Sequence, residues 1–95
     1  MSDWGFAQTD PSQLLARVHL FSVVKVQEDR EVEFTITVKE YYTPADPAAQ
    51  FFAQADKQTN QSVAPYTPSG WGNSLYEALS RCVKEIHRFP YQEPV

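Results

Sequence analysis

Alternation of apolar and polar residues predicts two strands in the first half of the chain, over residues 17–27 and 31–42. Both segments are rich in β-branched residues, which favours strands. On one side of the second strand the residues are Val32, Phe34, Ile36 and Val38. On one side of the first strand they are Val18, Leu20, Ser22, Val24 and Val26. The short polar segment between the two predicts an antiparallel hairpin.

The register of this hairpin is predicted from the side chains that should face the core. Pairing Val26 with Val32 keeps the apolar sides of both strands together. It also places Lys25 opposite Glu33 on the outer side, which is a favourable cross-strand pair. A slip of one residue would set valines against glutamates and expose the apolar set of the first strand. We therefore expect the register that pairs Val26 with Val32.

This register leaves Phe21 and Val23 on the outer side of the first strand, where they are more apolar than a solvated surface requires. Two explanations are open. The N-terminal arm, residues 1–10, would cover them, or they would form a dimer seam. The first is preferred. The arm itself is small, polar and loose, and Trp4 would pin it to the domain.

Asp10 and Pro11 predict a short helical turn over residues 10–16, because aspartate caps helices and proline fits the first helical position.

Residues 48–58 fit two kinds of element. Asp46 as a cap and Pro47 as the first residue favour a helix. Phe51, Ala53 and Ala55, however, alternate as in a strand. A lone hairpin is marginal in water, so a third strand over residues 50–57 is the preferred interpretation.

The composition of residues 59–73 predicts a long loop, rich in Asn, Gln, Ser, Pro and Gly. Loops of this length in small domains are often functional. The loop leads into a helix over residues 74–88, which is the clearest element of the sequence. Ser74 and Glu77 have the spacing of a capping box, and Pro90 ends the helix.

Together these elements predict an α+β fold in a single domain, residues 1–95. The antiparallel sheet has two or three strands, and the helix over residues 74–88 packs on one face. The expected core is Leu20, Val24, Val26, Phe34, Ile36, Val38, Leu75, Leu79, Val83 and Ile86.

Charge narrows the classes of partner. The net charge is −4, with eight Lys and Arg against twelve Asp and Glu, which argues against unaided nucleic-acid binding. The sequence has neither an apolar run long enough to span a membrane nor a recognisable secretory signal. Together with a single cysteine, these features predict a cytoplasmic protein without membrane contact.

Nothing in the sequence indicates catalysis, a cofactor or a metal site. Cys82 falls on the apolar stripe of the helix, where a structural role is expected, and His87 points to another helix face. His19 lies on a strand face with Lys25 and Gln27, far from the second histidine in sequence. We therefore expect a protein that is not an enzyme.

The glycine pair of Gly70-Trp71-Gly72 has two interpretations. One is an anion or carboxylate held at the N-terminus of the helix. The other, which we prefer, is a tight turn that needs positive φ angles. The motif lacks both the full dinucleotide fingerprint and a Walker lysine.

Aromatic residues cluster around this junction, which makes it the predicted interaction surface. Its candidate residues are Lys57, Asn60, Tyr66, Trp71, Tyr76 and Arg81. For Trp71 itself, a lid that folds over the core is the preferred interpretation, and an anchor for a partner is the alternative. The preferred function is a small non-enzymatic interaction or regulatory module that binds a protein partner or itself through residues 59–73.

The segment from Gly70 to Ala78 resembles the Gly-x-Gly-x-Ser-Lys-Lys-x-Ala junction of double-stranded-RNA-binding domains. The resemblance implies a similar sheet and helix. Leu75 and Tyr76 stand where that family has its phosphate-binding lysines, which argues against RNA binding. The Ser-Leu-x-Glu-Ala-Leu pattern also resembles the helix start of HicB-type antitoxins. The alternative function is a degenerate nucleic-acid binder, which would need a basic strip of Lys57, Arg81, Lys84 and Arg88.

Overall fold

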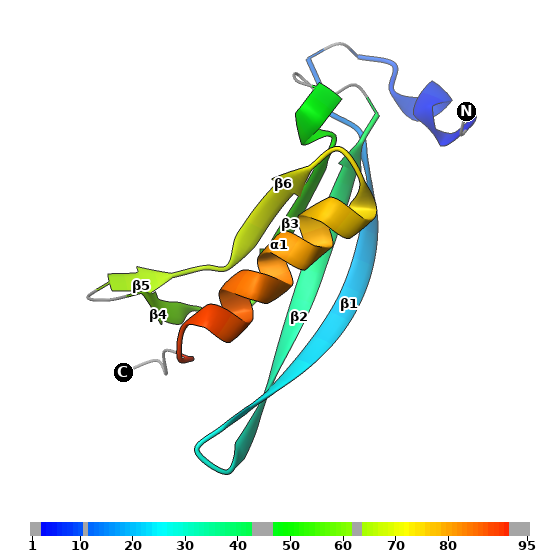
Figure 1. Ribbon diagram of the computed structural model, residues 1–95. Coiled ribbons are helices and arrows are strands. Elements are labelled where there is room, and N and C mark those ends of the chain that lie inside the picture. Colours follow the sequence, from blue (N-terminus) through cyan, green and yellow to red (C-terminus); the bar gives the residue numbers. More distant parts are fainter. Residues whose placement is uncertain (1–2, 11, 43–46, 62–63, 92–95) are drawn as a thin grey trace.

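The computed structural model describes residues 3–10, 12–42, 47–61 and 64–91, and Figure 1 shows the arrangement of its elements. In chain order they are η1 (Asp3–Ala7), β1 (Ala16–Gln27), β2 (Arg30–Tyr41), η2 (Pro47–Ala49), β3 (Phe51–Ala55), β4 (Thr59–Gln61), β5 (Ala64–Tyr66), β6 (Ser69–Gly72) and α1 (Leu75–Arg88).

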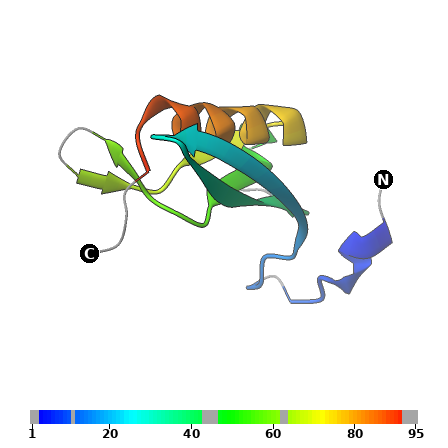
Figure 2. The ribbon, with the colours of Figure 1, turned by 90° about the horizontal axis from the view of Figure 1, so that it is seen from below.

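The fold has two layers, a four-stranded antiparallel sheet and α1 across one of its faces (Figures 1 and 2). The strand order is β1-β2-β3-β6, and β4 and β5 form a separate two-stranded sheet. The predicted α+β class is confirmed, but the sheet has four strands instead of two or three. The third strand is present as β3, while the helix considered for residues 48–58 is limited to the short 3₁₀ turn η2. Asp46 lies outside the described residues.

The prediction of a loop over residues 59–73 was wrong, because this segment contains β4, β5 and β6. β6 completes the main sheet by pairing with β3, with Phe52 opposite Trp71 and Ala53 opposite Gly70. Glycine is depleted in strands, so local composition indicated a loop. Packing against α1 overrides that preference.

The glycines of β6 are required by close approach of the helix. A Cβ on Gly70 would lie 2.7 Å from the carbonyl oxygen of Ala78, and one on Gly72 would lie 2.7 Å from its backbone nitrogen. Neither glycine has a positive φ angle, so the predicted tight turn was wrong. α1 therefore rests directly on the backbone of β6.

The predicted register of the β1–β2 hairpin was wrong by one residue. Val26 pairs with Glu31, and Lys25 pairs with Val32. The cause is the turn, since Glu28 and Asp29 have φ angles of 52° and 62°. Two consecutive left-handed residues form the two-residue hairpin turn that matches the twist of the strands, and such a turn fixes the register.

This one-residue difference reverses the two sides of β1. Phe21 and Val23 pack against the core on the helix side of β1, so they do not lie on the outer side where the predicted register placed them. Leu20, Val24 and Val26, which were expected in the core, lie on the opposite, exposed side. The buried apolar residues are Val32, Phe34, Ile36, Val38, Ala53, Ala55, Ala78, Cys82 and Ile86. Leu75, Leu79 and Val83, which were predicted in the core, are partly buried and pack against it.

The helix ends are satisfied by side chains. At its start, the Ser74 hydroxyl accepts from the Glu77 amide at 3.1 Å, as predicted. The Glu77 carboxylate accepts from the Asn73 amide at 3.3 Å, one residue earlier than in a standard capping box. At its end, the Lys25 ammonium donates to the carbonyl oxygens of Ile86 and Phe89.

The N-terminal segment contacts one end of the sheet through Trp4, whose ring lies edge-on to that of Tyr42 at 5.7 Å. The Asp10 carboxylate accepts from the amide and the hydroxyl of Ser12, and the Gln13 amide donates to the Asp10 carbonyl. The described part of residues 10–16 thus begins with a single turn, as expected, and Ala16 already belongs to β1. Pro11 lies outside the described residues.

Candidate interaction surface

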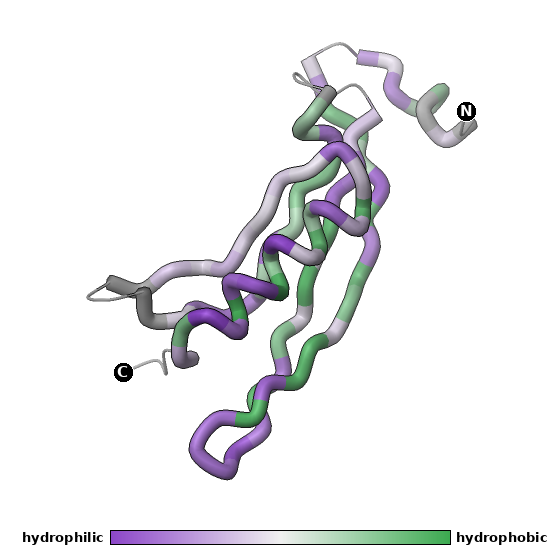
Figure 3. The backbone as a smooth tube through the Cα atoms, viewed as in Figure 1, coloured by the Kyte–Doolittle hydropathy of each residue, from purple (hydrophilic) through white to green (hydrophobic). Residues whose placement is uncertain are grey.

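The face of the sheet opposite α1, here called the open face, carries a row of exposed aliphatic side chains. They come from alternate residues of β1 and are, with their exposed fractions, Val18 (53%), Leu20 (68%), Val24 (51%) and Val26 (71%). We call these four residues the aliphatic stripe. Figure 2 shows α1 on one side of the sheet, and within the described ranges no element lies across the other side of β1. Figure 3 shows the hydrophobic stretches of this strand.

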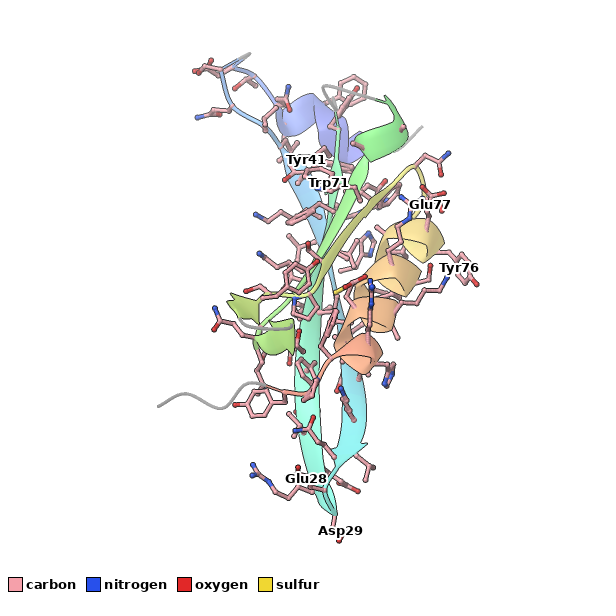
Figure 4. The ribbon with its side chains drawn as sticks, turned by 60° about the vertical axis from the view of Figure 1, so that its left-hand side comes forward. Glu28, Asp29, Tyr41, Trp71, Tyr76 and Glu77 are labelled. Atoms are coloured by element: carbon pink, nitrogen blue, oxygen red, sulfur yellow. The ribbon has the colours of Figure 1, made fainter. Side chains whose placement is uncertain are left out.

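An aromatic cluster lies on the same open face, at the ends of β2, β3 and β6. The Trp71 ring centre is 4.4 Å from that of Phe52 and 6.5 Å from that of Tyr41, with the latter pair nearly parallel. Trp71 is 48% exposed and points away from the helix-covered core, so it is not a lid over it (Figure 4). The three rings pack on one another and form an apolar surface.

Polar side chains of β2 separate the aliphatic stripe from the aromatic cluster. Glu33 and Lys39 are exposed on this strand, and Thr35 and Thr37 alternate with them along it. The Ser22 hydroxyl, in the middle of the stripe, donates to the Glu33 carboxylate at 2.7 Å. The open face thus has two apolar regions with a polar strand between them.

The structure distributes the six predicted interaction residues over several places. Trp71 lies on the open face, whereas Tyr76, which is 81% exposed, points to solvent from the outer side of α1 (Figure 4). Asn60 and Tyr66 belong to the β4–β5 hairpin. The remaining two are in ion pairs, Lys57 with Asp56 at 3.1 Å and Arg81 with Glu77 at 3.2 Å.

The aliphatic stripe was missed because the register was wrong. Its residues were recognised as apolar and then assigned to the core. The signal that could have found it is the polar segment Gln27-Glu28-Asp29-Arg30, since a two-residue turn at Glu28 and Asp29 gives the observed register.

Two cationic side chains of α1, Arg81 and Arg88, lie beside carboxylates. Arg81, Lys84 and Arg88 have the spacing of one helix face, as the alternative function requires. Arg81 pairs with Glu77, however, and Arg88 lies 3.7 Å from Glu85. These carboxylates reduce the positive potential that a phosphate backbone would meet.

Cys82 is fully buried, and burial raises the pKa of its thiol to about 12. The thiol donates to the carbonyl oxygen of Pro68 at 3.4 Å. Among the residues that the structure describes, no group of three or more His, Cys, Asp and Glu side chains is arranged to hold a metal ion.

A small group of polar side chains lies between β1 and β2 and consists of Arg17, His19 and Glu40. The Glu40 carboxylate lies 3.1 Å from both the Arg17 guanidinium and the His19 ring. Burial opposes ionisation of Glu40, but hydrogen bonds from His19 and Arg17 outweigh it and hold the pKa of Glu40 below its ordinary value.

No family model, curated protein or solved structure matches this chain. The resemblance to double-stranded-RNA-binding domains therefore stays a prediction. In the structure, the glycine pair of β6 leads from the sheet into the final helix, α1.

Among the described residues, no helix is long and apolar enough to cross a membrane.

Proposed function

We propose that this protein is a small non-enzymatic interaction module whose contact surface is the open face of its sheet. The observation that carries the proposal is the aliphatic stripe, in which two pairs of aliphatic side chains, one on each side of Ser22, are all more than half exposed. The proposed function, an interaction module, is the one expected from the sequence. The main contact surface, however, is assigned to β1 and not to residues 59–73.

Exposed apolar surface is unfavourable in water, and its burial lowers the free energy. Burying one valine or leucine side chain is worth about 1.5–3 kcal/mol. Contiguous exposed apolar patches on soluble domains commonly mark interaction sites. A partner that covered the stripe would remove this surface from water, and Trp71 offers an aromatic anchor on the same face, of the type that dominates many interfaces.

The nucleic-acid alternative has weaker support. It depends on a continuous basic strip, and Arg81 and Arg88 both lie beside glutamates. The net charge of −4 adds long-range repulsion of a phosphate backbone. A gel shift at low salt would support this alternative, because phosphate contacts weaken steeply with salt.

Site-specific photo-crosslinking in the native host tests the proposal. A photoreactive residue replaces Leu20 on the open face in one variant and Tyr76 on the outer side of α1 in a matched control. Both positions are exposed, at 68% and 81%. We expect a discrete protein adduct from position 20 and none from position 76. Adducts from position 76 alone, or from neither position, would contradict the proposal.

A further inference from the structure

β1 is an edge strand of twelve residues whose outer edge pairs with no strand in the described part of the chain. Its backbone N–H and C=O groups point alternately toward β2 and toward the outer edge. The Tyr42 amide donates to the Leu15 carbonyl at 3.0 Å, in continuation of the ladder between β2 and β1. Hydrogen-bonded and non-hydrogen-bonded pairs alternate along an antiparallel ladder. Odd-numbered residues of β1 therefore bond to β2, and even-numbered residues direct their N–H and C=O groups outward.

The even-numbered residues are also those that carry the aliphatic stripe, with Ser22 at their centre. The sequence is nearly symmetric about this serine. Two residues away on either side are Leu20 and Val24, and four residues away are Val18 and Val26. An antiparallel copy of the same strand is thus complementary to it in both side chains and backbone groups.

We propose that a second copy of this chain pairs with β1, antiparallel and centred on Ser22, so that two four-stranded sheets become one of eight strands. Leu20 would lie opposite Val24 of the second copy, and Val18 opposite its Val26. All five outward-facing residues from position 18 to position 26 would exchange backbone hydrogen bonds. The inference rests on the proposed function, because the second copy is the partner that it assigns to the stripe.

The charges around this edge are compatible with the pairing. No stripe position is charged, and β1 contains no proline. Charged residues and prolines are among the features with which exposed edge strands usually avoid association, and the outer edge of β1 lacks both. On the helix side, Phe21 would lie opposite Val23 of the second copy. The nearby Lys25 ammonium is already bound to helix carbonyl groups, and His19 to Glu40.

The pairing would place both helices on the same side of the joined sheet and both aliphatic stripes side by side on the open face. Each aliphatic side chain would gain a cross-strand neighbour, which is the unit of sheet stabilisation. The other arrangement of two copies, with open faces stacked as in a sandwich, would set the exposed Glu33 and Lys39 of each copy into the interface.

The first test is sedimentation equilibrium of the full chain over a concentration series. We expect twice the mass of the chain for the natural sequence and the mass of a single chain for Val24→Pro. Proline removes only the outward-directed N–H at this position, and prolines are tolerated where an edge strand faces solvent. Circular dichroism of the variant monitors its fold. A single-chain mass for the natural sequence at every concentration would overturn the proposal.

The second test fixes the register by disulfide formation, with Ser22→Cys and Val18→Cys as a matched pair. Cα atoms in a directly opposed hydrogen-bonded pair are about 5.5 Å apart, within disulfide reach. The two copies of position 18 would lie eight residues apart along the strands, about 27 Å. We expect a covalent dimer from Ser22→Cys and little from Val18→Cys. Equal yields, or a higher yield from Val18→Cys, would overturn the pairing even for a dimeric protein.

The outcomes separate this inference from the proposed function. A monomeric protein whose photoreactive position 20 captures a different protein overturns only the pairing of two copies. A monomeric protein that gives no adduct from position 20 overturns both.

Discussion

The ammonium of Lys25 in β1 donates a hydrogen bond of 2.8 Å to the carbonyl oxygen of Ile86 in the last turn of α1. The same ammonium also donates to the Phe89 carbonyl, just beyond the helix. The last carbonyl groups of a helix have no partners within it, and a cation near them interacts favourably with the helix dipole. A charged residue on the inner side of β1 thereby holds the sheet to the end of the helix.

Lys25→Met keeps the aliphatic stem and removes the ammonium. We expect it to lower the free energy of unfolding by about 1–2 kcal/mol, because two helix carbonyl groups lose a charged donor. Urea denaturation measures the effect. Lys39→Met, at an exposed position of β2, is the control and should change stability by less than about 0.5 kcal/mol. Equal effects of the two substitutions would contradict this role of Lys25.

Gly70→Ala should lower stability by about 1–3 kcal/mol, because its Cβ would meet the backbone of α1 at two places. The Ala78 oxygen would lie at 2.7 Å and the Cys82 nitrogen at 3.0 Å. Thermal unfolding compares it with Ser69→Ala, which adds no atom to the same strand. A Gly70→Ala protein as stable as the natural sequence would show that α1 does not rest on β6.

Glu40→Gln tests a pH-dependent contribution to stability. Burial disfavours the Glu40 carboxylate, but hydrogen bonds from His19 and Arg17 prevail, and its pKa is lowered in the folded protein. A lowered carboxyl pKa stabilises the fold above the unfolded value, about 4.3, and this contribution is lost as the pH falls through the folded value. Since the Arg17 side chain is 48% exposed, we expect a loss below about 1 kcal/mol.

The measurement for Glu40→Gln is urea unfolding at pH 7 and at pH 3. The difference from the natural sequence should be present at pH 7 and shrink at pH 3, where Glu40 itself becomes protonated. A difference of the same size at both pH values would show that the substitution acts through packing.

The Cys82 thiol should resist thiol reagents in the folded protein. Its pKa of about 12 leaves little thiolate at pH 8, and its side chain is fully buried. A colorimetric thiol assay should show slow labelling of the native protein and complete labelling in denaturant. Rapid labelling under native conditions would contradict the burial of Cys82.

Val23→Lys and Val24→Lys form a matched pair on opposite sides of β1. Val23 packs against the core, whereas Val24 is 51% exposed on the open face. We expect Val23→Lys to cost about 2 kcal/mol more than Val24→Lys in unfolding experiments at low protein concentration. The reverse order would support the register that pairs Val26 with Val32.

The sequence predicts β2 and α1 well because each has one apolar side and one polar side. Phe34 and Ile36 were correctly placed in the core, and Ser74 correctly begins the helix. β1 was recognised as a strand, but it is apolar on both sides, so its pattern alone could not choose between Phe21 and Leu20. The left-handed turn at Glu28 and Asp29 makes that choice.

β6 and the open face could not be predicted from local sequence. Gly70 and Gly72 form a strand only because α1 lies against their backbone, a contact between segments that composition does not reveal. The same holds for Trp71, whose place beside Tyr41 and Phe52 depends on the order of the strands.

Photo-crosslinking from position 20 is the most direct test of the central claim, that the aliphatic stripe is the contact surface of this protein. The quantity measured is the mass of the adduct that forms there. We predict a discrete adduct from this position, at twice the mass of the chain when the purified protein is irradiated alone, and none from position 76. The absence of any adduct from position 20, whether or not position 76 forms one, would contradict the claim.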